Sequence, residues 1–144
     1  MPSVTATQSP IITAPLSASR HVRCDQKWLI TRQGIESKEL IWVPALAPSE
    51  RLFKRYLGEW KGRDVEKYWP IYVEFFEEEL KTKEKLDALR ELWHLSSSGI
   101  SVGLFCYCSS PLHCHRSLIG NFLKNHGATI TEYRNLSMMM RHFQ

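Results

Sequence analysis

Three of the four cysteines and two of the six histidines fall within the eleven residues 106–116. Thiols, imidazoles and a guanidinium at this density could bind a metal, bind an anion or carry out nucleophilic chemistry. An apolar segment typical of a strand precedes the run, and a segment typical of a helix follows it. Because open α/β folds commonly bind ligands at such strand-to-helix connections, we treat residues 106–116, called here the Cys/His loop, as the candidate functional site.

The helix after this loop favours an anionic ligand. Backbone N–H groups at a helix N-terminus attract negative charge, and a cation placed there is unfavourable unless an anion or a carboxylate neutralises it. Arg116 is therefore a candidate for ligand contact, with a salt bridge to a distant carboxylate as the equal alternative. In the first case, the candidate catalytic residues are Cys114 as a thiolate, His115 as a proton or hydrogen-bond donor, and Arg116. The candidate ligand-binding residues are Arg116, Cys106, Tyr107 and Ser109.

A zinc site is the second interpretation of the loop. Cys106, Cys108, Cys114 and His113 supply ligands of the right type and number for tetrahedral zinc, although their spacing is irregular. Thiol chemistry is the third interpretation, because a cysteine at a helix N-terminus beside His and Arg has a stabilised thiolate. In that case Cys106 or Cys108 could form a disulfide with Cys114. The structural alternative is that Cys106 and Cys108 are small buried side chains at the end of a strand. No cysteine is followed by five residues and an arginine, which argues against a cysteine-phosphatase mechanism.

Strand and helix patterns alternate along most of the chain. Residues 100–107 have the apolar character of a strand buried on both faces. Residues 118–126 show a helical pattern that Gly127 ends, and residues 128–133 are typical of a further strand. This strand–helix–strand order predicts a right-handed βαβ unit with parallel strands.

Upstream, two extended segments are expected at 28–31 and 40–43. Three amphipathic helices follow: one capped by Ser49 and ending at Gly58, one starting near Trp69 because of Pro70, and one after Thr82. These patterns predict an α/β fold, a single compact Rossmann-like domain of three layers with a mostly parallel sheet.

The expected domain covers residues 27–133. Residues 1–26 form a leader that is either flexible or contributes a first strand at Ser3–Thr7, since the first 19 residues hold no charged side chain. Residues 134–144 are expected to be a C-terminal tail or a short helix.

Composition narrows the class of protein and its location. The chain has 144 residues, of which 43% are hydrophobic, and a net charge of +4 from 19 basic and 15 acidic residues. This modest excess permits an anionic partner without requiring nucleic acid. No apolar stretch approaches the length of a membrane span, and the cysteine pattern is not that of a secreted disulfide scaffold. We therefore expect a cytoplasmic protein with no membrane partner.

The loop and the strand before it resemble a known family. Gly103-Leu104-Phe105-Cys106-Tyr107 followed by Cys114-His115-Arg116 is similar to the signature of the domain-of-unknown-function family numbered 488, and the run Leu46-Ala47-Pro48-Ser49 resembles its middle section. The resemblance covers about residues 27–133. It implies a Rossmann-like domain with functional residues Cys106, Tyr107, Cys114, His115 and Arg116, but no particular substrate. Members typically carry a glutamate after Cys-Tyr. Here that position is Cys108, which removes a candidate general base and adds a thiol.

Two classes of function follow from these residues. The first is a domain that binds a phosphate-bearing ligand, a nucleotide or a nucleic-acid end, at the Cys/His loop and hydrolyses it or transfers a group. The alternative is a zinc- or redox-dependent module without catalytic activity that binds a protein partner. A weaker third interpretation is a single-strand binder that uses tryptophans as stacking platforms.

Overall fold

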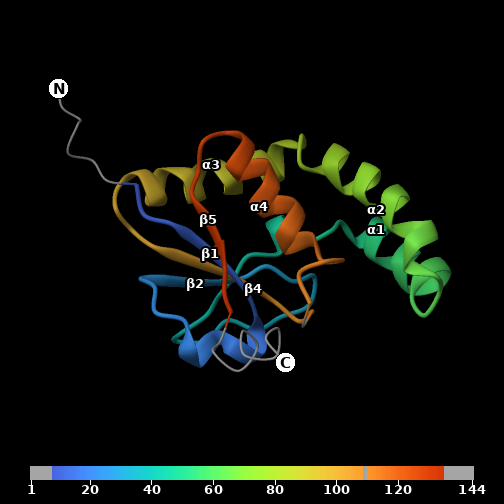
Figure 1. Cartoon of the computed structure of the whole chain (residues 1–144), viewed down its shortest axis with the longest axis horizontal. Coiled ribbons are helices and arrows are strands. Elements are labelled where there is room, and N and C mark those ends of the chain that lie inside the picture. The colour runs from blue at the N-terminus through green and yellow to red at the C-terminus, as the bar shows by residue number, and fades with distance from the viewer. Residues whose placement is uncertain (1–7, 109, 135–144) are drawn as a thin grey trace, which may run out of the picture.

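The computed structural model describes residues 8–108 and 110–134, which form an α/β domain with one five-stranded sheet (Figure 1). All strand pairs are parallel, and the strand order is β3-β2-β4-β1-β5. The strands are β1 (Ile11–Pro15), β2 (Gln26–Leu29), β3 (Ile41–Trp42), β4 (Val102–Cys106) and β5 (Ile130–Glu132). The α-helices are α1 (Glu50–Arg55), α2 (Val65–Glu79), α3 (Lys83–Ser97) and α4 (His115–Asn125). Short helical segments are η2 (Leu16–His21), η3 (Pro44–Leu46) and the π-helix η4 (Tyr56–Trp60). The α/β Rossmann-like architecture expected from the sequence is confirmed.

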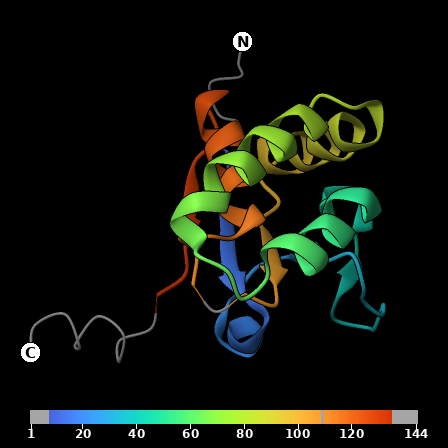
Figure 2. The same ribbon diagram turned by 90° about the vertical axis from the view of Figure 1, so that its right-hand side faces the viewer.

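Strand β4 is the centre of the sheet and leads directly into the Cys/His loop. All five of its residues are buried, as expected for a strand covered on both faces. Its alternate side chains enter two separate clusters: Leu104 and Cys106 join the large core with the α-helices, while Phe105 packs with η2 in a smaller one. Helices α2, α3 and α4 lie together on the side of the large core (Figures 1 and 2).

Strand β1 is an inner strand of the sheet and lies between β4 and β5. In the sequence it falls within residues 1–26, the range expected to be a leader. Its register pairs Pro15 with Cys106 of β4, and Thr13 with Glu132 of β5. The strand expected at Ser3–Thr7 lies outside the described residues, as does nearly all of the expected C-terminal tail.

Two helix boundaries differ from the expected ones. The helix capped by Ser49 continues through Gly58 as η4, because its far end is anchored by the buried Trp60 side chain. Helix α2 begins at Val65 and contains Pro70 rather than starting near it. Proline lacks an N–H donor and leaves one carbonyl of the preceding turn free, but Pro70 lies on the exposed face of α2, where water can satisfy that carbonyl.

The remaining caps follow the expected pattern. The Ser49 hydroxyl accepts a hydrogen bond from the Leu52 N–H, which confirms its role at the start of α1. Gly127, which follows the C-cap residue His126 of α4, has a φ of +99°, a conformation that residues with side chains rarely adopt. Within the described part of the chain, no helix has the length and apolarity needed to cross a membrane.

Candidate functional site

The Cys/His loop lies at the carboxyl edge of the parallel sheet, between β4 and α4. Cys106 is the last residue of β4, Cys114 is the N-cap residue of α4, and His115 and Arg116 form its first turn. This is the strand-to-helix position at which parallel sheets commonly bind ligands. Ser109, an expected ligand-binding residue, lies outside the described residues.

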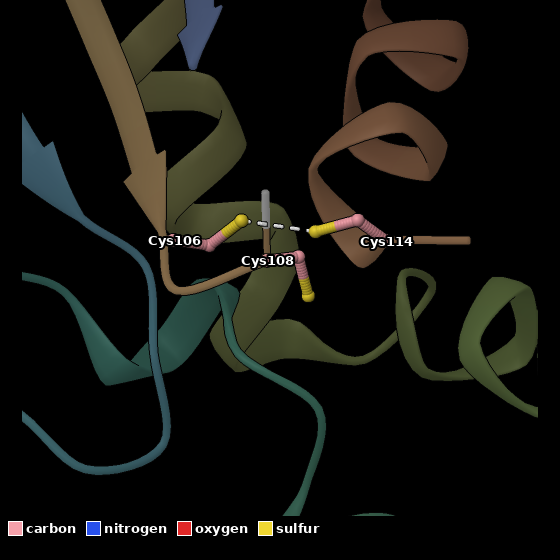
Figure 3. Close-up of side chains that lie close together, drawn as sticks. All are labelled: Cys106, Cys108 and Cys114. Carbon is pink, nitrogen blue, oxygen red and sulfur yellow. Dashed lines mark hydrogen bonds between the residues drawn. The ribbon is translucent and has the colours of Figure 1, made fainter. Parts of the chain in front are cut away.

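Three thiols converge in this loop. The Sγ atoms of Cys106, Cys108 and Cys114 all lie within 4.8 Å of one another (Figure 3), and those of Cys106 and Cys114 are 2.9 Å apart. Cys106 and Cys114 are buried, whereas Cys108 is exposed, and all three are free thiols. The cluster forms because the end of β4 and the start of α4 face each other across the loop. These three residues could hold a metal ion.

The Arg116 side chain is completely buried behind this thiol cluster. Its Nη1 donates to the Cys106 sulfur at 3.0 Å and to the Cys108 carbonyl oxygen at 2.6 Å. Its Nε and Nη2 donate to the two carboxylate oxygens of Glu132 at 3.1 and 2.9 Å, a bidentate ion pair. The Thr13 hydroxyl donates to the same carboxylate at 2.6 Å. The contacts of Arg116 are thus those of the salt-bridge alternative, and its guanidinium faces protein groups rather than the solvent.

The neighbouring His115 is enclosed and has a fixed tautomer. Its Nε2 lies 2.6 Å from the Ile30 carbonyl oxygen, so this nitrogen carries the proton and donates it. Burial lowers the pKa of His115 below its usual value, which favours the neutral ring. The unprotonated Nδ1 lies 3.9 Å from the Cys114 sulfur, where it can accept a proton from that thiol.

The thiols of Cys108 and Cys114 do not ionise independently. The neighbouring thiols of Cys106 and Cys114, together with the nearby Arg116 charge, lower the pKa of Cys108 to about 3. The neighbouring thiols of Cys106 and Cys108, together with burial, hold the pKa of Cys114 well above its usual value. These opposite directions favour the thiolate form of Cys108 over that of Cys114.

The cluster opens into a cavity of about 210 Å³. Five aromatic side chains line it: Phe53, Tyr56, Trp69, Tyr72 and Tyr107. Further lining residues are Thr31, Arg32, Gln33 and Pro48, the three cysteines, His113 and His115. No Asp or Glu among the described residues lines it, and Arg32 is its one Lys or Arg side chain. The Arg32 guanidinium could pair with an anionic group of a ligand in this cavity.

Most residues expected from the sequence meet at this site. Tyr107 lines the cavity at its exposed rim, and its hydroxyl donates to the Gln33 carbonyl oxygen at 3.1 Å. His113 also lines the cavity, but it is not part of the group of three sulfur atoms, and its ring lies edge-on to Trp69 with 5.2 Å between ring centroids.

Sequence reasoning did not predict two parts of the site, the segment Thr31–Gln33 and the residue Glu132. The segment Thr31–Gln33 follows β2, a neighbour of β4, so its place at the same carboxyl edge is a signal that the sequence contained. Glu132, the carboxylate partner of Arg116, is an isolated acid in a short strand, and only the β1–β5 pairing explains its position.

Comparisons with known proteins give one positive result. No curated protein and no solved structure matches the chain. A family model, DUF488-N3a, described as the "Active DUF488-N3 subclade", matches residues 16–127. The matched range includes the strand β4, the Cys/His loop and the helix α4 that carry the site. The chain therefore belongs to the DUF488 family, in the subclade that this model describes.

Proposed function

We propose that the Cys/His loop is a thiolate centre that acts on a phosphate-bearing small molecule in the adjoining cavity, by hydrolysis or group transfer. The observation that carries this proposal is the opening of three converging thiols, of which Cys108 is exposed, into a cavity lined with aromatic side chains. A thiolate, not a thiol, is the nucleophile in cysteine chemistry.

The roles within the cluster follow from exposure and hydrogen bonding. Cys108 is the nucleophile, because it is the exposed member and its pKa is lowered. The Cys106 and Cys114 sulfurs lie within 4.8 Å of its sulfur, and the neutral His115 accepts or returns the Cys114 proton. Arg116 stabilises the negative charge from behind, as a positioning residue held by Glu132.

Three features support a small phosphate-bearing ligand. The cavity volume suits a small molecule better than a nucleic-acid end. The lining contains Arg32 and no carboxylate among the described residues, which favours an anion. The matching subclade is described as active, which favours catalysis over a purely structural role. Four free thiols are consistent with a reducing compartment, and we propose the cytoplasm.

Turnover of a panel of phosphate esters by single-cysteine variants tests this function. Cys108→Ser should abolish turnover while leaving the folded state intact, because Cys108 is exposed. Cys24→Ser, outside the cavity lining, is the matched control and should keep full activity. An active Cys108→Ser protein would contradict the assignment of Cys108 as the nucleophile.

A zinc-dependent module that binds a protein partner is the second candidate. It is favoured by the three sulfur atoms within 4.8 Å of one another. The 2.9 Å separation of the Cys106 and Cys114 sulfurs is an argument against it. Two thiolates on one tetrahedral zinc, with bonds of about 2.3 Å, lie about 3.8 Å apart. Unfolding in the presence of a chelator would support the metal, since structural zinc contributes directly to folding free energy.

A further inference from the structure

The aromatic side of the cavity presents flat, pre-positioned rings. Trp69 and Tyr72, one helical turn apart on α2, are stacked with 5.0 Å between ring centroids and 13° between ring planes. Tyr72 is buried, and it stacks in turn on Phe76 with centroids 6.1 Å apart. Aromatic rings that are already held by their neighbours bind a flat ring at a low entropic cost. This side of the cavity is therefore suited to a planar ring.

The charge of the cavity comes from Arg32, not from Arg116. Arg32 is half-exposed, whereas every nitrogen of the Arg116 guanidinium donates to a protein group. Arg32 is in the cavity lining, and its Nη2 donates to the Pro44 carbonyl oxygen at 3.0 Å, which fixes that end of the side chain. An anion that enters the cavity would meet this guanidinium, the one Lys or Arg side chain among the described residues of the lining.

The backbone that carries Arg32 is also fixed in place. The Trp42 indole N–H donates to the Thr31 carbonyl oxygen at 2.8 Å, and the Tyr107 hydroxyl donates to the Gln33 carbonyl oxygen at 3.1 Å. These two bonds fix the backbone on either side of Arg32. The bond to Gln33 comes from Tyr107, a residue of the Cys/His loop itself. The cation is consequently pre-organised relative to the thiol cluster.

We infer that the cavity takes a planar ring linked to a phosphate, such as a nucleoside monophosphate, with the ring on Trp69, which Tyr72 supports from behind, and the phosphate on Arg32. This inference rests on the proposed function and names its substrate class and the residue that anchors it.

Binding of matched probes to the full chain tests this inference. Isothermal titration calorimetry is run with the four common nucleosides, their 5′-monophosphates and inorganic phosphate. The best-bound monophosphate should bind at least about tenfold more tightly than its nucleoside, since a charged hydrogen-bonded contact is worth that much or more. Arg32→Gln should bring this ratio close to one without weakening nucleoside binding, and Arg32→Lys should restore part of it.

Two further variants separate ring binding from general effects. Trp69→Leu should weaken the nucleoside and the monophosphate together by about tenfold, the scale of losing one stacked ring. Arg90→Gln, an exposed arginine of α3 outside the cavity lining, is the matched control and should bind all probes as the wild type does.

Three outcomes would overturn the inference: equal binding of nucleosides and monophosphates, unchanged monophosphate binding by a folded Arg32→Gln protein, or no binding of any probe. Iodoacetamide alkylation of Cys108 at pH 6 on the same samples separates this failure from a failure of the proposed function. A reactive Cys108 without probe binding refutes only the ligand class, whereas an unreactive Cys108 contradicts the thiolate centre.

Discussion

Replacing Glu132 by glutamine should destabilise the protein through Arg116. The Glu132 carboxylate accepts three hydrogen bonds, two from the guanidinium at 2.9 and 3.1 Å and one from the Thr13 hydroxyl at 2.6 Å. Arg116 is fully buried, so its charge is left without an anion when the carboxylate becomes an amide. A glutamine oxygen in the place of Oε1 can still accept two of the three bonds, from Thr13 and from Arg116 Nε, but its NH₂ group then faces the Nη2 donor of Arg116.

The size of the effect follows from this loss. Removing one partner of a buried ion pair costs about 3–5 kcal/mol. Because the Glu132 side chain is 22% exposed and glutamine retains one acceptor, we expect a loss of about 2–3 kcal/mol in the free energy of unfolding. With a urea m-value of about 2 kcal/mol/M, the unfolding midpoint should fall by about 1–1.5 M.

Urea denaturation followed by circular dichroism measures this change. Thr13→Val should cost about 1 kcal/mol, and the double variant should lose less than the sum, because both residues act on one network. Asp87→Asn, which breaks exposed pairs with Lys83 and Arg90 on α3, is the control and should leave the midpoint unchanged. A Glu132→Gln loss below about 0.5 kcal/mol, the scale of an exposed pair, would refute the buried ion pair as a stabilising element.

The other predictions concern the thiols, a cap and a turn. Cys108, whose pKa is lowered, is a thiolate above that pKa and should react with iodoacetamide at pH 6; Cys24, whose pKa is raised by burial, should react only in alkaline solution. Peptide mass spectrometry gives both pH profiles, and identical profiles would contradict the lowered pKa of Cys108. Ser49→Ala should lower the free energy of unfolding by about 1–2 kcal/mol, since it removes the α1 cap and the hydrogen bond from the Ser49 hydroxyl to Glu79; an unchanged urea midpoint would show that the cap is not needed. Gly127→Ala should cost about 1 kcal/mol because its φ is +99°, and an equally stable variant would show that the backbone there relaxes freely.

The elements that could be predicted from the sequence are those whose hydrophobic periodicity and end signals lie within a short stretch of the chain. The strand–helix–strand unit from β4 to β5 was recognised because an apolar run, a 3.6-residue periodicity and Gly127 follow one another in the sequence. Strand β1 was not placed at Ile11–Pro15, since five residues bounded by prolines among Ser and Thr carry little local signal. Its strand structure depends on pairing with β4 and β5, which are about 90 and 120 residues away in the chain.

In the site, too, residues that are neighbours in the sequence were predicted and residues brought in from distant segments were not. The Cys/His loop was predicted from residue types alone, because its members are neighbours in the sequence. The carboxylate of Glu132 and the guanidinium of Arg32 come from other strands and loops, and the sheet order brings them to the loop. Sequence spacing therefore identified the thiols but not the partners that set their charge or line their cavity.

Metal content and free-thiol count, measured on protein purified under reducing conditions without chelator, test the thiolate centre most directly. The proposed function predicts four titratable thiols per chain and no stoichiometric metal, with Cys108 reacting first. About one zinc per chain with Cys106, Cys108 and Cys114 protected from thiol reagents would contradict the thiolate centre and identify the cluster as a metal site.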